Sequence, residues 1–159
     1  MPTLISISAG ANKVMAGFAL DCTRDVVAAV QVHKILAPIC ELCETSKNKV
    51  VVESAIGCIE VALAKWDTFR RNDVDLIVEA VQRCLGAASP KARETARKAF
   101  WGLRRLYPAR AERVFKAQDA RTQNLITEAE PEVAAEEEEK NPPPFPTKPP
   151  QSQEEGREW

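Results

Sequence analysis

Two cysteines downstream of the only histidine are the first candidates for chemistry in this sequence. Cys40 and Cys43 form a CxxC pair, and His33 precedes them. Thiolate and imidazole groups bind zinc, but a closed zinc site needs four ligands, and the other candidates are scattered along the chain. The i, i+3 spacing also fits one apolar helix face. It therefore favours buried structural cysteines over metal or redox chemistry, with His33 on the surface or capping a helix.

Motifs for nucleophilic, phosphate or zinc-protease chemistry do not occur in this sequence: it contains no GxSxG, P-loop, GxGxxG or HExxH. We therefore expect a protein that is not an enzyme and that uses no cofactor or metal. Its five cysteines, in a chain that shows no signal-peptide pattern, indicate a reducing compartment. The sequence contains no run of about 18 uncharged apolar residues, so it predicts no membrane span.

Lysines recur in three short polar breaks, at Lys13, at Lys47 and Lys49, and at Lys91. Lys13, Lys49 and Lys91 are 36 and 42 residues apart, and each precedes a helical pattern. A period near 40 residues with two helices per unit is typical of HEAT repeats. Equivalent loops of such a stack line up along one edge, so these lysines would form a basic row. Ordinary surface polarity is the alternative interpretation of the same lysines.

A second basic feature is the segment 83–116, which holds ten basic and two acidic residues. This density suits an acidic partner or a phosphate backbone. Aromatic residues suited to base stacking do not alternate with the basic ones, so nucleic acid is the weaker option. A solvated helix face explains the same segment without any partner.

Apolar residues at helical spacing predict the elements that carry these residues. We expect helices over 14–30, 32–43, 50–66, 73–85 and 91–106, and a last helix that starts at 109. Asp73 and Ser89 are expected N-caps, and Pro90 suits a first helical position. Pro38 falls inside the second helix and should kink it there.

The end of the chain differs in composition. Residues 121–159 hold four basic and ten acidic residues, and seven of the eleven prolines lie after Glu128. Few large apolar side chains are available there to offset the entropy of ordering, so this tail should be disordered. We therefore divide the chain into a helical-repeat domain, 1–120, and an acidic, proline-rich tail, 121–159, which could contact the basic face or other proteins.

The segment 89–115 resembles the last HEAT repeat of a TOG domain of the cytoplasmic linker-associated protein (CLASP) family. The matching residues are Ala92-Arg93, Ala96-Arg97-Lys98, Phe100-Trp101-Gly102 and Leu106-Tyr107. Upstream, Lys13–Ala16 and the stretch from Ser46 to Trp66 resemble earlier loop-to-helix segments of the family. The resemblance covers about two thirds of the chain.

The resemblance implies an all-α HEAT-repeat solenoid, a partial TOG-like paddle made of the C-terminal repeats. It also implies a non-catalytic role in binding tubulin and microtubules and in regulating microtubule dynamics, in the cytoplasm and at the cytoskeleton. The implied contacts lie in the intra-repeat loops, at Lys13, Lys47, Asn48, Lys49 and Lys91.

Arg93 either joins these contacts or pairs inside the stack. Trp66, Phe100 and Trp101 are expected in the core. Val52 and Glu53 stand where the family tends to be basic. The alternatives are a HEAT-repeat scaffold that binds proteins without tubulin, and a nucleic-acid binder acting through 83–116.

Overall fold

The computed structural model describes residues 5, 10 and 12–131. Within them the chain is helical and contains no strand. The expected tail beyond residue 131, with its glutamate run and polyproline stretch, lies outside the described residues. In chain order the elements are α2 (Lys13–Ala29), the 3-10 helix η1 (His33–Ile35), α3 (Leu36–Thr45), α4 (Lys49–Lys65), α5 (Arg71–Leu85), α6 (Pro90–Leu106), α7 (Pro108–Lys116) and α8 (Ala120–Glu128).

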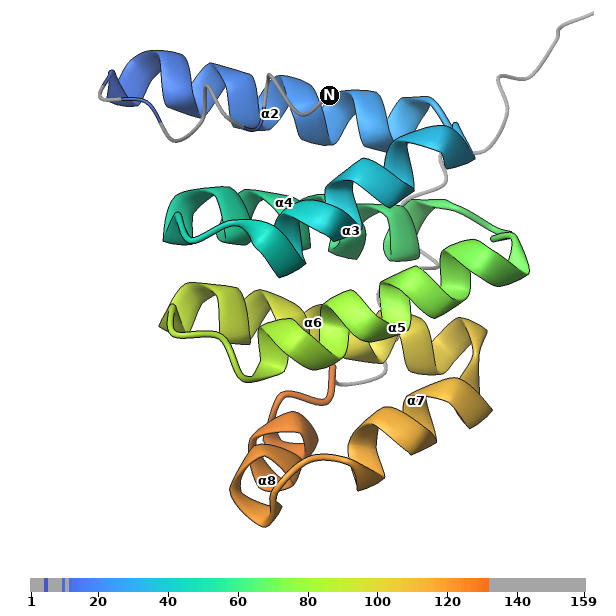
Figure 1. The fold of residues 1–159 in the computed structure, drawn as a ribbon. Coiled ribbons are helices and arrows are strands. Elements are labelled where there is room, and N and C mark those ends of the chain that lie inside the picture. The colour runs from blue at the N-terminus through green and yellow to red at the C-terminus, as the bar shows by residue number, and fades with distance from the viewer. Residues whose placement is uncertain (1–4, 6–9, 11, 132–159) are drawn as a thin grey trace, which may run out of the picture.

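The helices stack in two layers (Figure 1). α2, α4 and α6 pack side by side in one layer, while α3, α5 and α7 form the other. The α3–α4 and α5–α6 hairpins join the layers, so each hairpin is one repeat and buries its apolar face against its neighbours. The expected all-α solenoid of HEAT type is confirmed.

Side-chain caps mark the starts of α2, α4, α6 and α8. Asn12, Asn48, Ser89 and Asp119 each accept a hydrogen bond from a backbone N–H in the first turn of the helix that follows. The second-layer helices α3, α5 and α7 have no side-chain cap. The caps therefore recur once per repeat, and of the two N-caps expected from the sequence Ser89 is confirmed.

Pro38 does not kink a helix. The predicted helix over 32–43 is instead a 3-10 turn followed by α3, which starts at Leu36. Pro38 is then the third helical residue, where the backbone N–H has no partner within the helix. The expectation of a kink was wrong because the apolar spacing continues through the 3-10 turn and hides the true start of the helix.

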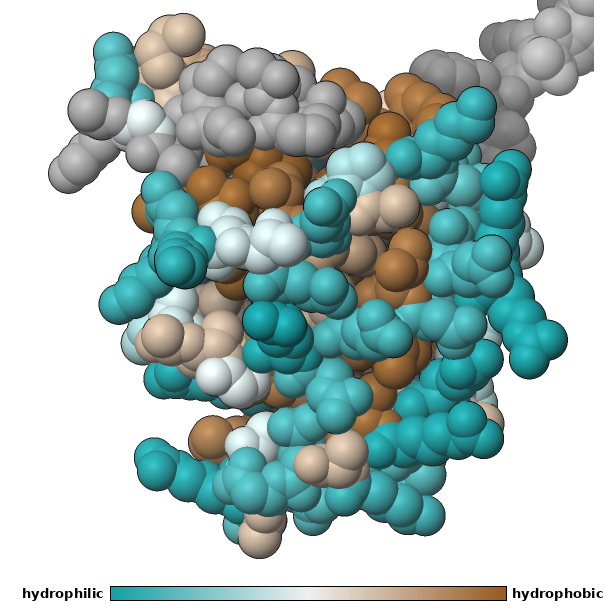
Figure 2. Space-filling view, viewed as in Figure 1, coloured by the Kyte–Doolittle hydropathy of each residue, from teal (hydrophilic) through white to brown (hydrophobic). Residues whose placement is uncertain are grey.

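The core runs through the whole stack. Trp66 and Phe100 are buried, as expected, and the Trp66 indole donates to the Val27 carbonyl oxygen over 2.7 Å. α4 and α6 approach each other closely at Leu63 and Gly102. A Cβ added at Gly102 would lie only 3.0 Å from the Leu63 Cβ, so the glycine leaves room for this approach. Figure 2 shows polar side chains over much of the outer face of α3, α5 and α7, with apolar residues between them.

Trp101 is only half-buried, which corrects its expected place in the core. Its Nε1 donates to the Ile126 carbonyl oxygen over 3.0 Å, so it docks α8 rather than filling the interior. Ile126 is fully buried. The folded part of the chain therefore continues to Glu128, into the segment assigned to the tail from its composition.

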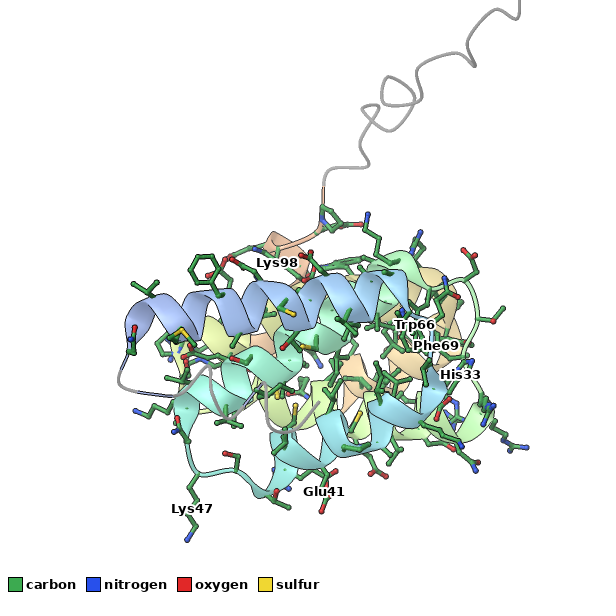
Figure 3. All side chains as sticks on the ribbon, turned by 90° about the horizontal axis from the view of Figure 1, so that it is seen from above. His33, Glu41, Lys47, Trp66, Phe69 and Lys98 are labelled. Carbon is green, nitrogen blue, oxygen red and sulfur yellow. The ribbon has the colours of Figure 1, made fainter. Side chains whose placement is uncertain are left out.

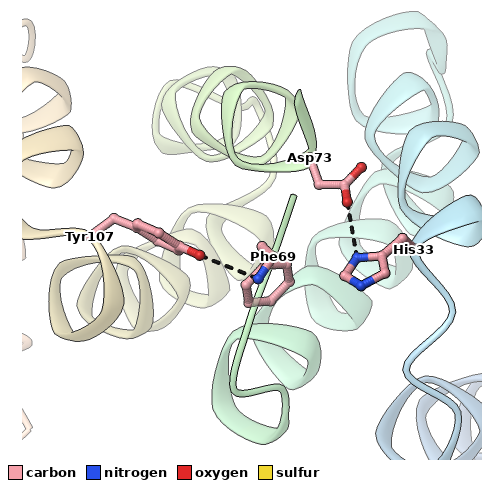
Figure 4. Close-up of polar contacts among 4 residues, drawn as sticks. All are labelled: His33, Phe69, Asp73 and Tyr107. Carbon is pink, nitrogen blue, oxygen red and sulfur yellow. Dashed lines mark hydrogen bonds and ion pairs between the residues drawn. The ribbon is translucent and has the colours of Figure 1, made fainter. Parts of the chain in front are cut away.

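Polar and aromatic contacts join the inter-repeat turns at one edge of the stack (Figure 4). His33 Nδ1 lies 3.0 Å from Asp73 Oδ2. The Phe69 N–H donates to the Tyr107 hydroxyl over 3.3 Å. Between these two contacts, Trp66 stacks on Phe69 with the ring centroids 5.4 Å apart.

Two expectations about His33 and Asp73 are corrected by this edge. α5 starts two residues before Asp73, so Asp73 lies in the first turn and does not cap the helix. His33 is half-buried and meets the Trp66 ring edge-on at 5.7 Å, so it is neither a surface nor a capping residue. Both belong to the packing of the turns.

Candidate functional site

The polar breaks of the sequence lie along one edge of the solenoid, which we call the basic edge. The start of α2, the α3–α4 loop and the α5–α6 loop lie on the same side of the stack in Figure 1. Lys13 and Lys49 are the first residues of α2 and α4, and Lys91 is the second residue of α6. The lysines therefore hold nearly equivalent places in successive repeats, and Lys13 is placed here by its backbone alone.

The lysines of the two central loops are free for a partner. Lys47, Lys49 and Lys91 are exposed, and none of them takes part in an ion pair with the described residues. Figure 3 shows Lys47 pointing outward at one edge, with His33, Trp66 and Phe69 gathered at the opposite edge. The basic edge is therefore separate from the edge where the turns are joined.

Asn48 has a structural role within this edge. Its side-chain Oδ1 accepts from the Val50 N–H over 3.0 Å and caps α4. Its own N–H donates to the Ser46 hydroxyl over 3.2 Å. Because these two bonds fix the α3–α4 loop, Asn48 holds Lys47 and Lys49 in place.

Arg93 also points into the protein. Its Nη1 donates to the Ala87 carbonyl oxygen over 2.7 Å and to the Ala88 carbonyl oxygen over 3.2 Å. Of the two roles open for Arg93, this geometry favours pairing inside the stack. The guanidinium braces the α5–α6 loop beside Lys91.

A second contact ties the loops to each other. The Ser89 hydroxyl donates to the Glu53 carboxylate and accepts from the Ala92 N–H over 3.3 Å. Glu53, which stands where the family tends to be basic, thereby joins α4 to the start of α6. Its carboxylate accepts from the Ser89 hydroxyl and keeps its negative charge.

Between the α3–α4 and α5–α6 loops lies an open cavity of about 260 Å³. Lys47 and Lys49 line it on one side, and Arg83 and residues 86–89 line it on the other. Arg83 was expected only as part of the basic segment 83–116 and not as a residue of this site, because it lies outside the polar breaks. Its position in the last turn before a loop was the available signal.

The two cysteines of the CxxC pair lie in the core of the stack. Cys40 and Cys43 are both buried, as the helix-face interpretation predicts. The Cys43 thiol donates a hydrogen bond to Cys84, and this bond together with burial raises the pKa of Cys43, while burial raises the pKa of Cys40 to about 12. Among the described residues no group of three or more histidine, cysteine or acidic side chains is placed to hold a metal ion.

Comparison with known proteins gives the family. The family model described as "CLASP N terminal" matches residues 1–127. The chain belongs to the CLASP family. CLIP-associating protein 1-B of Xenopus laevis is 25% identical over 127 residues, which are 79% of this chain and 9% of that protein. Protein CLASP-2 of Caenorhabditis briggsae is 28% identical over the same length, again 79% of this chain and 16% of that protein.

The resemblance to CLASP proteins is therefore confirmed, and the matched region is their N-terminal domain. That the helices correspond to the later repeats of a TOG paddle stays a prediction. The chain spans between 9% and 16% of the length of these CLASP relatives. In the described part of the chain, no helix is long and apolar enough to cross a membrane.

One further basic residue repeats the pattern in α8. Asp119 caps this helix and Arg121 is its second residue, as Ser89 and Lys91 are for α6. Arg121 is exposed. It was missed because the composition of 121–159 assigned it to the tail, although an acidic N-cap followed by a helical spacing was present in the sequence.

Proposed function

We propose that this CLASP-family chain binds tubulin and microtubules without catalysis, through the loops of its basic edge, and so regulates microtubule dynamics. The contacts are Lys13, Lys47, Lys49 and Lys91, with Asn48 and Arg93 holding the loops in position. Tubulin binding is what the resemblance to CLASP TOG domains implies. Cytoplasm and cytoskeleton are the locations that follow from this function.

The observation that carries the proposal is the set of exposed lysines Lys47, Lys49 and Lys91 on one rigid edge, which form no ion pair with the described residues. Exposed lysines that form no ion pair keep their full charge for a partner. Tubulin is acidic, so a row of fixed cations increases both the rate of encounter and the specificity of docking. The packed repeats beneath the loops hold the spacing of these cations.

A scaffold that binds another protein without tubulin is the second candidate. It is favoured by the outer face of α2, where Val14, Met15 and Phe18 are 66%, 56% and 69% exposed. Large apolar side chains grouped in this way suit contact with a protein. The acidic tail is a further candidate surface for other proteins.

Co-sedimentation with microtubules tests the first candidate. Changing Lys47 and Lys49 to Glu in the full chain should weaken binding about tenfold at low salt. A matched control changes Lys34 and Lys65 to Glu, since both are exposed and lie away from the α3–α4 loop. It should bind within about twofold of wild type, because solvent and salt screen charges outside the contact.

The salt dependence adds an independent readout. The difference between the two double variants should shrink as salt rises, since screening acts over about 8 Å at physiological ionic strength. Circular dichroism checks that both variants remain helical. If the folded Lys47/Lys49 variant binds like the control at low salt, the basic edge is not the tubulin contact and the scaffold becomes the better candidate.

A further inference from the structure

The cavity between the α3–α4 and α5–α6 loops is lined by three cationic side chains. We propose that it receives one carboxylate side chain from an acidic segment of the partner protein, held by Lys47, Lys49 and Arg83. This inference rests on the proposed function and adds to it a defined anchoring point. Arg83 becomes a binding residue, and Ala88 becomes a residue that controls access.

The charges around the cavity favour an anion. Lys47, Lys49 and Arg83 all line it, against one acidic side chain, that of Glu44. None of the three cations forms an ion pair with the described residues. A carboxylate that enters the cavity therefore meets three cations that are not ion-paired with the described residues, against the one lining carboxylate of Glu44.

The backbone adds to this charge. α4 and α6, each 17 residues long, both begin beside the cavity, and the caps Asn48 and Ser89 use only part of their first-turn N–H groups. A helix N-terminus carries a partial positive charge and free N–H donors, and both favour an anion. Two such ends and three side-chain cations thus point to the same class of ligand.

The cavity is large enough to admit a side chain. Its volume of about 260 Å³ equals that of roughly nine water molecules. This space suits the carboxylate and methylene groups of one glutamate or aspartate. Val52 and Ala87 add apolar wall on which those methylene groups can pack.

The cavity is also held open before a partner binds. Arg93 fixes the α5–α6 loop through two backbone carbonyl oxygens, and Asn48 fixes the α3–α4 loop. The Ser89–Glu53 contact sets the distance between the two loops. Preorganised loops lose little conformational entropy on binding, so little of the electrostatic attraction is offset by the cost of ordering them.

The first test uses a synthetic peptide of six glutamates as the probe, with calorimetry on the full chain at low salt. Arg83→Gln should weaken peptide binding about five- to tenfold. Arg71→Gln is the matched control, because Arg71 is exposed at the other end of the same helix and the charge change is identical. It should change the affinity less than about twofold.

The second test fills the cavity without changing its charge. Ala88 lines the cavity and is exposed, and its backbone is not left-handed, so Ala88→Leu should fold normally. If a side chain must enter, this variant should also weaken peptide binding several-fold, and thermal melting checks its fold. Equal affinities of wild type, Arg83→Gln and Ala88→Leu for the peptide would overturn the proposal.

Tubulin binding by the same variants separates this inference from the proposed function. If only the Lys47/Lys49 variant loses tubulin binding, while Arg83→Gln and Ala88→Leu bind like wild type, the proposed carboxylate site is overturned. Tubulin binding through the basic edge then stands. If Arg83→Gln and Ala88→Leu both weaken peptide binding but wild type does not bind tubulin, the proposed function fails and the carboxylate site stands.

Discussion

Changing Arg93 to Ala is expected to destabilise the α5–α6 loop rather than to remove a direct contact with the partner. The change deletes two hydrogen bonds from a charged guanidinium to the carbonyl oxygens of Ala87 and Ala88, at 2.7 Å and 3.2 Å. A hydrogen bond to a charged group contributes about 1.5–3 kcal/mol when it is well formed and protected from water.

The expected loss for Arg93→Ala follows from the two bonds taken separately. The bond to Ala87 is short and partly buried, while the bond to Ala88 is longer and exposed. Counting mainly the first, we expect the free energy of unfolding to fall by about 2 kcal/mol. Arg93→Lys keeps the charge and can restore one bond, so it should lose about 1 kcal/mol.

Urea denaturation followed by circular dichroism measures this loss. Lys91→Ala, which removes an exposed and unpaired cation from the same helix turn, is the control and should stay within about 0.5 kcal/mol of wild type. At temperatures where Arg93→Ala is folded, it should bind tubulin more weakly than wild type but better than the Lys47/Lys49 variant. If it unfolds like wild type and binds as poorly as that variant, Arg93 is a partner contact and our reasoning is wrong.

Four further predictions rest on the burial and hydrogen bonding of single residues. Phe18 is 69% exposed and Phe100 is fully buried, so Phe18→Ala should stay within about 0.5 kcal/mol of wild type in the same denaturation experiment while Phe100→Ala costs about 3–5 kcal/mol. Trp101→Phe removes the hydrogen bond from the indole N–H to the Ile126 carbonyl oxygen in α8. Hydrogen exchange of α8 amides should therefore accelerate, while that of α4 amides stays nearly unchanged. Equal acceleration in both helices would show that α8 does not open separately. Cys22 alone among the five cysteines is exposed, so it alone should react with iodoacetamide before unfolding. Burial raises the pKa of Cys40 from 9.0 to about 12, so the unfolded chain loses this proton first. The free energy of unfolding should therefore fall as the pH rises from 9 toward 12, by up to about 1.4 kcal/mol per pH unit for this thiol, and a Cys40→Ala variant should show a smaller fall.

The helices of the solenoid were predictable because each buries one continuous face. Apolar residues at three- and four-residue spacing identify α4, α5 and α6 to within about two residues of their observed ends. The start of α6 was predictable in detail, since Ser89 and Pro90 are local signals. The alignment of the basic loops followed from the repeat period, which is also a property of the sequence alone.

The features that the sequence did not reveal depend on contacts between distant residues. His33 pairs with Asp73, which lies 40 residues further along, and no local pattern links them. α8 contains few apolar residues and is held by Trp101, which lies 25 residues before Ile126. Composition alone therefore assigned it to the tail.

The cavity needed the structure for a similar reason. Arg83 precedes one loop and Lys47 lies in another, and the packing of α3 beside α5 and of α4 beside α6 brings these loops together. The residue types could be identified in the sequence, but their distance could not. Arg93 shows the converse, since its type suggests a partner contact while its observed bonds are internal.

Aromatic and polar contacts at one edge fix the spacing between successive repeats. They involve His33, Trp66, Phe69 and Tyr107. They join successive turns at the edge opposite the lysines, so bending the solenoid to spread the basic loops would have to break the Trp66–Phe69 stacking or the Phe69–Tyr107 bond. The interval between the loops is thus set before any partner arrives. A partner whose acidic groups recur at that interval can engage several loops at once, whereas one with a different interval engages a single loop and dissociates quickly.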